Sequence, residues 1–463
     1  MTNGSSSNLS RRNFVQLTAA GAAAGAAGCV GGGDGDDTIS DSVGRDSDSL
    51  DDGERPVEWI GPDWAVADAQ ANKFTEMTDV DINTTIATIG DTQAQILGGG
   101  STNIDVVTTD TSGSAAMTRD NPVTLPMAVD DLENWNEDNV SDLFTDPESA
   151  LGHLDEQVET FTRELWADGD AKDELLFSPY AYNFDAMGYN PSYVDDVSLW
   201  SALFDDQYSG EVIVGETAAI TIPQTMMHLL DNDMIDANIG ELNDPSQDQL
   251  DTAIDFLVEQ KEAGQFRSTW EAYGESVTLM AGEEAVIGDV WQPAAMDVRR
   301  DGTPCTYATM SDGVQGYRFW YGGMSILEGA AERDNVAEAY SLYDDVHMGA
   351  WFPGFVQQRG YSVPHYENRE LVRDGSDDSG EGMGPEYYDW AYEGESTYEP
   401  VDEPALFDPA EYDWSMEEGE PDSNGGTRDS GPIEERINRI GFFQIWPSEA
   451  DYMTQRWEEF LSA

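Results

Sequence analysis

The residue types that carry out catalysis are few and scattered in this sequence. None of the four histidines stands at metal-ligand spacing, and the sequence holds no H-E-x-x-H motif, no G-x-S-x-G motif and no P-loop. These histidines are His153, His228, His347 and His365. The pattern predicts that the protein is not an enzyme and that it has no catalytic residues, metal site or other cofactor.

Aromatic residues gather instead at the ends of predicted strands. The run Tyr317–Tyr321 contains four rings, and a second aromatic run spans Ser178–Asp185. Trp59, Trp64 and Trp291 flank further predicted strands. Rings at strand ends are suited to enclose an organic ligand in a cleft, although any one of them could equally belong to the core. As a set they favour a binding site for a small organic solute.

The elements that position these rings alternate between strand and helix. Short apolar runs predict strands at residues 57–60, 80–86, 104–107, 211–214 and 285–291. Apolar residues at helical spacing predict helices at residues 62–77, 92–97, 250–263, 336–343 and 448–461. Such alternation is typical of a parallel sheet covered by helices, so the expected fold class is α/β.

The first 29 residues have the features of an export signal. Arg11 and Arg12 precede a short apolar run that ends at Cys29. Paired arginines in this position are typical of twin-arginine export, and Ala26-Ala27-Gly28-Cys29 is similar to a lipobox, whose cysteine carries lipid. The run is shorter than the roughly 20 residues that a membrane helix needs. We expect a mature protein outside the cytoplasm, anchored to the cytoplasmic membrane through Cys29; a disordered Ala/Gly terminus is the alternative.

The composition is strongly acidic, with 93 acidic against 21 basic residues and a net charge of −72. Nucleic acids and anionic membrane surfaces are excluded as partners, because both bind basic patches. Acid excess with only three lysines is similar to the proteins of extreme halophiles such as haloarchaea. Residues 30–55 contain almost nothing apolar and predict a flexible acidic tether, and residues 374–431 predict an acidic insertion.

Several segments, taken in order, resemble the extracellular solute-binding proteins of ABC importers, specifically the spermidine/putrescine-binding group. The resemblance covers about residues 56–373 and the last helix. The segments that carry it are Val57-Glu58-Trp59-Ile60, Phe74 to Val80, Ile104-Asp105-Val106-Val107, Ser178 to Asn190, Trp200 to Gly210, Ala281 to Trp291 and Gly360 to His365.

This resemblance implies a two-lobe, periplasmic-binding-protein-like fold with hinge strands that cross beside an inter-lobe cleft. Lobe 1 is expected to comprise residues 56–182 and 320–369, and lobe 2 residues 183–319 and 370–463. The crossings are expected near Asn183, Trp320 and Glu370. The implied function is capture of a small organic solute for an ABC permease and its ATPase.

The resemblance also implies a ligand site. Trp291, Trp320 and Tyr361 match ring positions of the family, and Trp59 lies in its first binding segment. The carboxylates that hold ammonium groups in polyamine binders are mostly replaced, for example by Gly322. Asp110, Asp63, Asp185 or Glu216 could replace them as charge partners of a cation. The expected ligand-binding residues are therefore Trp59, Asp110, Tyr182, Asp185, Trp291, Trp320 and Tyr361, and the charge of the ligand stays open.

Two alternatives differ in function class. The protein could hand its liganded form to a membrane sensory transducer instead of an importer. It could also be a secreted enzyme, for which the abundance of acidic residues is the sole support.

Overall fold

The computed structural model describes a subset of the chain. It covers residues 44–45, 55–62, 65–66, 68–120, 122–136, 139–154, 156–195, 197–349, 362–365, 370–371, 373–376, 380–381, 385 and 436–463. Arg11, Arg12, Cys29, Asp63 and Tyr361 lie outside these residues, as does most of the expected insertion at 374–431. None of the helices in these ranges combines the length and apolar character that a membrane crossing requires.

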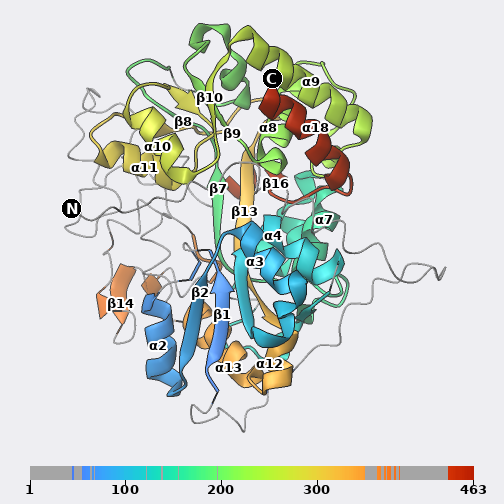
Figure 1. The fold of residues 1–463 in the computed structure, drawn as a ribbon, viewed down its shortest axis with the longest axis vertical. Coiled ribbons are helices and arrows are strands. Elements are labelled where there is room, and N and C mark those ends of the chain that lie inside the picture. The colour runs from blue at the N-terminus through green and yellow to red at the C-terminus, as the bar shows by residue number, and fades with distance from the viewer. Residues whose placement is uncertain are drawn as a thin grey trace, which may run out of the picture.

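The strands form two main sheets, as the α/β prediction required (Figure 1). The first sheet contains, in spatial order, β16 (Ile440–Phe443), β13 (Tyr317–Leu327), β3 (Val106–Asp110), β1 (Val57–Gly61) and β2 (Ile82–Ile86), with β4 (Thr124–Leu125) and β7 (Ser178–Asp185) also paired to β13. The second contains β10 (Phe266–Trp270), β9 (Val212–Gly215), β11 (Ile287–Gly288), β8 (Gly188–Tyr189) and β12 (Thr306–Tyr307). Two short pairs complete the described strands, β5 (Met127–Ala128) with β6 (Glu174–Leu175) and β14 (Gly375–Ser376) with β15 (Gly380–Glu381).

Helices surround each sheet and define two lobes. Lobe 1, around β1 to β3, includes α2 (Asp68–Thr78), α3 (Ile89–Gln95), α4 (Thr111–Ala115), α5 (Asp142–Thr145), α6 (Pro147–Ala150), α7 (Gln157–Leu165), α12 (Glu328–Arg333) and α13 (Val336–Ser341). Lobe 2, around the second sheet, includes α8 (Ala218–Asp231), α9 (Gln247–Ala263), α10 (Tyr273–Ala281), α11 (Gln292–Arg300) and α18 (Ala450–Ser462).

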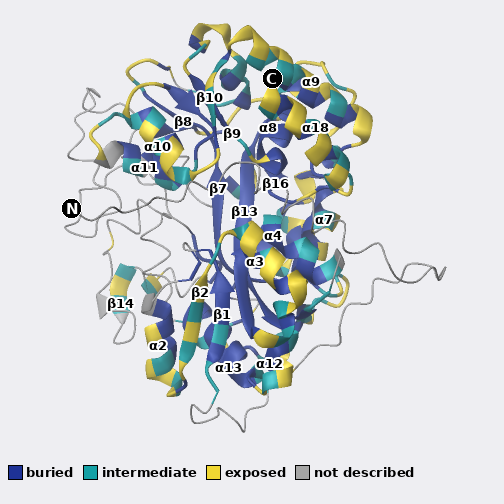
Figure 2. Ribbon diagram, viewed as in Figure 1, coloured by how far each residue is buried: buried dark blue, intermediate teal, exposed yellow. Residues whose placement is uncertain are grey.

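The strands β7 and β13 run from one lobe to the other and are buried along their whole length (Figure 2). They pair antiparallel, with Asn183 opposite Trp320 and Asp185 opposite Arg318. One half of β13 also pairs with β3 of lobe 1, and the other half with β16. At Gly323 a side chain would meet the Phe177 ring at 2.8 Å, so the close approach there requires glycine. The crossing strands therefore form the joint between the lobes; the exact lobe boundaries stay a prediction.

Most expected elements are confirmed, and α9 illustrates why. At the start of this helix the Ser246 side chain accepts the Gln249 backbone N–H, and the Gln249 side chain accepts the Ser246 backbone N–H. At its end, Gly264 adopts a φ of 82°, which terminates the helix. The expected strand at 285–291 is wrong beyond Ile287–Gly288. There the Asp289 carboxylate, and not a strand carbonyl, accepts the Gly215 N–H at 2.7 Å, and α11 begins at Gln292.

A segment of the expected tether contacts lobe 1. The Arg45 guanidinium lies 3.1 Å from the Asp345 carboxylate and donates to Ser341 at 3.0 Å. Its backbone N–H donates to Asp131 at 2.8 Å. An arginine thus neutralises part of an acidic surface of this lobe.

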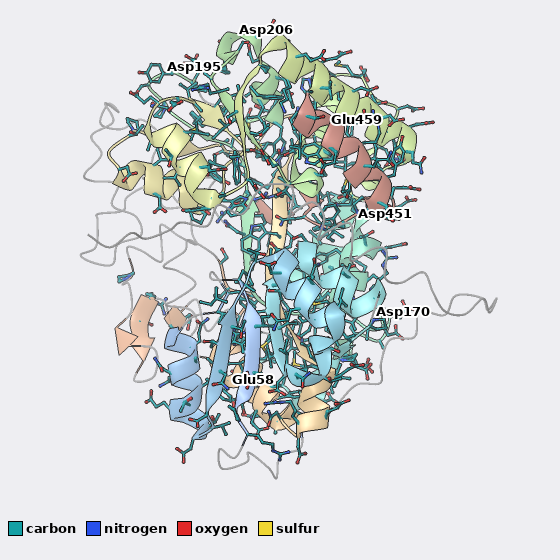
Figure 3. The ribbon with its side chains drawn as sticks, in the orientation of Figure 1. Glu58, Asp170, Asp195, Asp206, Asp451 and Glu459 are labelled. Atoms are coloured by element: carbon teal, nitrogen blue, oxygen red, sulfur yellow. The ribbon has the colours of Figure 1, made fainter. Side chains whose placement is uncertain are left out.

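Acidic side chains are spread over the outside of both lobes. Figure 3 labels six of them: Glu58 and Asp170 in lobe 1, and Asp195, Asp206, Asp451 and Glu459 in lobe 2. The distribution agrees with an acidity that belongs to the whole surface and not to one binding site.

The first prediction concerns salt. We expect the melting temperature to rise strongly between millimolar and molar KCl, because the Debye length falls from about 10 Å at 0.1 M to about 3 Å at 1 M and screens the repulsion of a net charge of −72. Thermal unfolding followed by circular dichroism measures this dependence. At about pH 3, where surface carboxyl groups begin to protonate, the salt effect should shrink. Equal stability in both salts at neutral pH contradicts the prediction.

Candidate functional site

A cluster of buried charges lies where β7 and β13 pass between the lobes. Arg318 and Asp185 are each 2% exposed and form an ion pair through Nη2 of the guanidinium. The Asp185 carboxylate also accepts bonds from Trp320 Nε1 at 2.8 Å and from the Tyr307 hydroxyl at 3.1 Å. Since Tyr307 belongs to lobe 2, Asp185 joins that lobe to both crossing strands.

Lobe 1 contributes Asp110, at the carboxyl end of β3. One carboxylate oxygen caps α4 by accepting the Ser112 N–H at 2.9 Å, and the other accepts from Gln444 Nε2 at 3.2 Å. Asp110 is 8% exposed, and burial raises its pKa, whereas the Ser112 bonds and the charge of Arg318 act in the opposite direction. Asp110 is thus a buried carboxyl group within electrostatic range of Arg318.

Lobe 2 contributes Asp289, directly after β11. Its carboxylate accepts the Gly215 N–H at 2.7 Å and Trp270 Nε1 at 3.2 Å. Burial raises its pKa to about 7, and the charge of Arg318 partly offsets that increase. One guanidinium on a crossing strand therefore acts on carboxyl groups from lobe 1, from lobe 2 and from the joint itself.

The backbone brings two of the expected ring residues to this cluster. Trp320 is 7% exposed, and its indole is held by Asp185. Trp291 is half-buried; its ring lies 5.4 Å from that of Trp270 and stacks on Tyr273. The next backbone N–H, at Gln292, lies 3.4 Å from the Asp185 carboxylate. Trp320 thus contacts Asp185 directly, whereas the ring of Trp291 packs against Trp270, whose indole donates to Asp289.

Two other expected ring residues belong to the core. Trp59 is 1% exposed, donates to Thr108 Oγ1 at 3.0 Å and packs edge-on against His347. Tyr182 has no exposed surface and packs against Phe144. Both rings contact other side chains of the folded core, so we leave them out of the proposed site.

The expected site residues did not include Arg318, Asp289 or Gln292. Arg318 interrupts an aromatic run, and Asp289 follows the apolar pair Ile287-Gly288. A charged residue inside such a run is a signal of a buried charge, because charged side chains are rarely buried unless paired. The acidic background of the sequence hides this signal for Asp289.

A surface depression of about 580 Å³ lies elsewhere, beside α7, and is lined by Arg119, Val158, Arg163, Trp166 and other residues of lobe 1. It shares no residue with the Arg318 cluster. Its position on a single lobe gives it no part in contacts between the lobes. Within the described ranges, no group of His, Cys, Asp and Glu has the arrangement of a metal site.

The sequence matches the family model of bacterial extracellular solute-binding proteins over residues 69–343. This match spans more than half of the chain, and the protein belongs to that family. The family comprises substrate-binding proteins of ABC transporters, which are not enzymes. A comparison with curated proteins gave no match.

Solved structures share the fold at low identity. A putative spermidine/putrescine ABC transporter protein from Listeria monocytogenes has a TM-score of 0.56 at 15% identity, covering 88% of this chain and 98% of its own. PotD from Streptococcus pneumoniae, a spermidine/putrescine substrate-binding protein solved with calcium and HEPES, has a TM-score of 0.55 at 15% identity over the same shares. The TpPotD lipoprotein of Treponema pallidum has a TM-score of 0.52 at 11% identity, covering 87% and 99%. These likenesses establish the two-lobe fold.

Proposed function

We propose that this protein is the lipid-anchored receptor of an ABC importer and that it captures a small organic solute at the Arg318 cluster. The observation that carries the proposal is that a buried carboxyl group from lobe 1, Asp110, and one from lobe 2, Asp289, both lie within electrostatic range of Arg318 on a crossing strand. A solute that contacts groups of both lobes favours the closed arrangement, which is how a hinged receptor signals that it is loaded. The permease and ATPase complex is the partner that would receive the solute.

The charge of the cluster favours a solute with a cationic group. Arg318 pairs directly with Asp185, which leaves Asp110 and Asp289 bonded to neutral donors. Burial disfavours the ionised form of both groups, and a cation nearby would restore it. The half-buried ring of Trp291 adds a surface on which a cation can lie. The names of the Listeria and Streptococcus proteins make a polyamine the first candidate to test.

The second prediction tests this site. In molar KCl, at least one class of organic cation should raise the melting temperature, since a ligand at 100 times its Kd adds about 2.7 kcal/mol to the stability of the folded state. Asp110→Asn should weaken that binding by roughly 2–5 kcal/mol, because a desolvated ammonium loses its charge partner. Asp170→Asn, an exposed change on lobe 1, serves as the control and should bind like the wild type.

Isothermal titration of both variants with the solute found in the thermal screen provides the measurement. Sugars and dicarboxylates complete the screen as neutral and anionic classes. Absence of any stabilising solute from all these classes contradicts the proposed function. Stabilisation by a neutral or anionic solute alone, with Asp110→Asn unaffected, contradicts the role of Asp110.

The third prediction concerns the anchor. Replacing Cys29 with Ser should release the protein into the medium in folded form, because the serine cannot accept lipid. Fractionation followed by immunoblotting measures the share that stays with the membrane. Replacing Cys305, which is buried in lobe 2, with Ser is the control and should leave membrane attachment unchanged. Membrane retention of the Cys29→Ser protein would overturn the lipobox assignment.

A further inference from the structure

Several buried polar atoms around Asp185 have no hydrogen-bond partner. Among the described residues that bond to its carboxylate, four buried side-chain atoms have no hydrogen-bond partner: Arg318 Nε, Gln292 Nε2, Gln292 Oε1 and Asn183 Oδ1. The exposed fractions of these residues are 2% for Arg318, 1% for Gln292 and 0% for Asn183. All three touch Asp185, through Arg318 Nη2, the Gln292 backbone N–H and Asn183 Nδ2.

Such a concentration of unmet groups is unusual in a folded protein. Most buried polar atoms have a partner, because a donor or acceptor removed from water without one costs free energy. The residues come from β7, β13 and the first turn of α11, so they meet where lobe 2 joins the crossing strands. In a hinged two-lobe fold, opening at the crossing strands is the motion that would give a solute access to these atoms.

The unmet atoms differ in kind, and this difference limits what can satisfy them. Arg318 Nε and Gln292 Nε2 are donors that require an oxygen on the ligand. Gln292 Oε1 and Asn183 Oδ1 are acceptors that require an N–H or O–H on the ligand. A polyamine offers donors and no acceptor when it is protonated, so it leaves Arg318 Nε and Gln292 Nε2 without partners.

We propose that the four atoms recognise the head group of an α-amino acid that carries a cationic side chain. The carboxylate of the head group accepts from Arg318 and Gln292, and its ammonium donates to Asn183 and Gln292. The cationic side chain is then available to Asp110 or Asp289. This inference rests on the proposed function, since it assigns the solute class to the same site.

Charge balance supports this assignment. The cluster contains three buried carboxyl groups and one guanidinium, and Arg318 pairs directly with Asp185. A zwitterionic head group adds no net charge beside that ion pair. A cationic side chain adds one positive charge beside Asp110 and Asp289, whose ionised forms are not paired with a cation in direct contact.

The first experiment compares matched ligands that differ by one carboxylate. Arginine and agmatine, lysine and cadaverine, and ornithine and putrescine form three such pairs, measured by isothermal titration against the full mature protein in molar KCl. We expect at least one of these amino acids to bind and its decarboxylated partner to bind at least 100-fold more weakly. An amine that binds as tightly as its amino acid overturns the head-group assignment and leaves the proposed receptor function standing.

A wider screen separates the two levels of the proposal. If none of these amino acids binds and a polyamine, betaine or sugar does, the head-group assignment fails and the receptor function stands. If no solute of any class binds, both fail.

The second experiment uses Gln292→Met, which keeps the length of the side chain and removes both of its unmet atoms. We expect the unliganded variant to melt at a higher temperature than the wild type, and its affinity for the amino acid to fall about 10- to 100-fold. Gln265→Met is the matched control. Gln265 is also buried, but its Nε2 donates to Leu203 and Asp205 carbonyls at 3.0 and 3.1 Å, so its loss should lower the melting temperature and leave the affinity unchanged.

A purely structural role for Gln292 gives a different outcome. If Gln292→Met lowers the melting temperature and binds the amino acid as tightly as the wild type, then water or another part of the protein satisfies the four atoms. That result overturns the inference.

Discussion

Asp185→Asn is expected to destabilise the protein by about 3–5 kcal/mol, the usual cost of removing one partner from a buried ion pair. The reason is that Arg318, at 2% exposure, would keep its charge with no carboxylate in contact. Trp320 and Tyr307 would also lose an ionised acceptor, which makes stronger hydrogen bonds than a neutral one. Urea unfolding in molar KCl measures the free energy of unfolding.

A second variant separates loss of the pair from loss of packing. Arg318→Met in the Asp185→Asn background removes the uncompensated charge and should recover part of the lost stability. Asp334→Asn is the control, because Asp334 pairs with Arg55 at 3.3 Å on the surface and such pairs contribute about 0–1 kcal/mol. A change below about 1 kcal/mol for Asp185→Asn would show that the ion pair does not maintain the joint.

Asp289→Asn is expected to stabilise the protein, and this effect should appear only at neutral and higher pH. The folded-state pKa of Asp289 is about 7, whereas the ordinary value is 3.8. Between these two values the folded protein retains a proton that the unfolded chain has released, so wild-type stability falls as the pH rises from about 4 to about 7. Above pH 7 both states are ionised, and the full penalty of roughly 4 kcal/mol is present. Asparagine does not titrate and carries no such penalty.

The difference in free energy of unfolding between Asp289→Asn and the wild type should therefore be small near pH 4 and largest at pH 8. The amide oxygen of the variant can still accept from Gly215 and Trp270, so the local fold has its acceptor. Denaturant unfolding at four or five pH values gives the profile. A difference that stays constant from pH 4 to pH 8 contradicts the pKa assigned to Asp289.

Local sequence patterns predicted the elements well, since capping, turns and apolar periodicity act over a few residues. The helix at 250–263 was expected from its apolar spacing and from Gly264, and the structure adds one turn before it because Ser246 is the cap. The α/β class was expected from the alternation of strands and helices, and the two-lobe fold from the order of the family motifs. The sheet topology and the solved structures confirm both. These features need no knowledge of which residues meet in space.

The candidate site was harder to predict, because it depends on contacts between distant segments. Trp59 and Trp320 look alike in the sequence as rings within apolar strands, yet Trp59 contacts His347 in the core and Trp320 contacts Asp185 at the joint. The pairing of Asp185 with Arg318 joins residues 133 positions apart. Periodicity has no signal at that range, and the acidic background of the chain conceals which carboxyl groups are buried.

The last residues of the chain have a consequence for its biosynthesis. β16 pairs with β13, and the side-chain amide of Asn243 both donates to the Phe443 carbonyl and accepts from the Phe443 N–H. The helix α18 packs on α9, where Lys261 donates to the carbonyl of Phe460 at 2.8 Å. Until the ribosome has added residues 440–462, the edge of β13 that pairs with β16 and the surface of α9 that packs on α18 are uncovered. These contacts therefore form only after residues 440–462 have been synthesised, as is usual where contacts join distant segments.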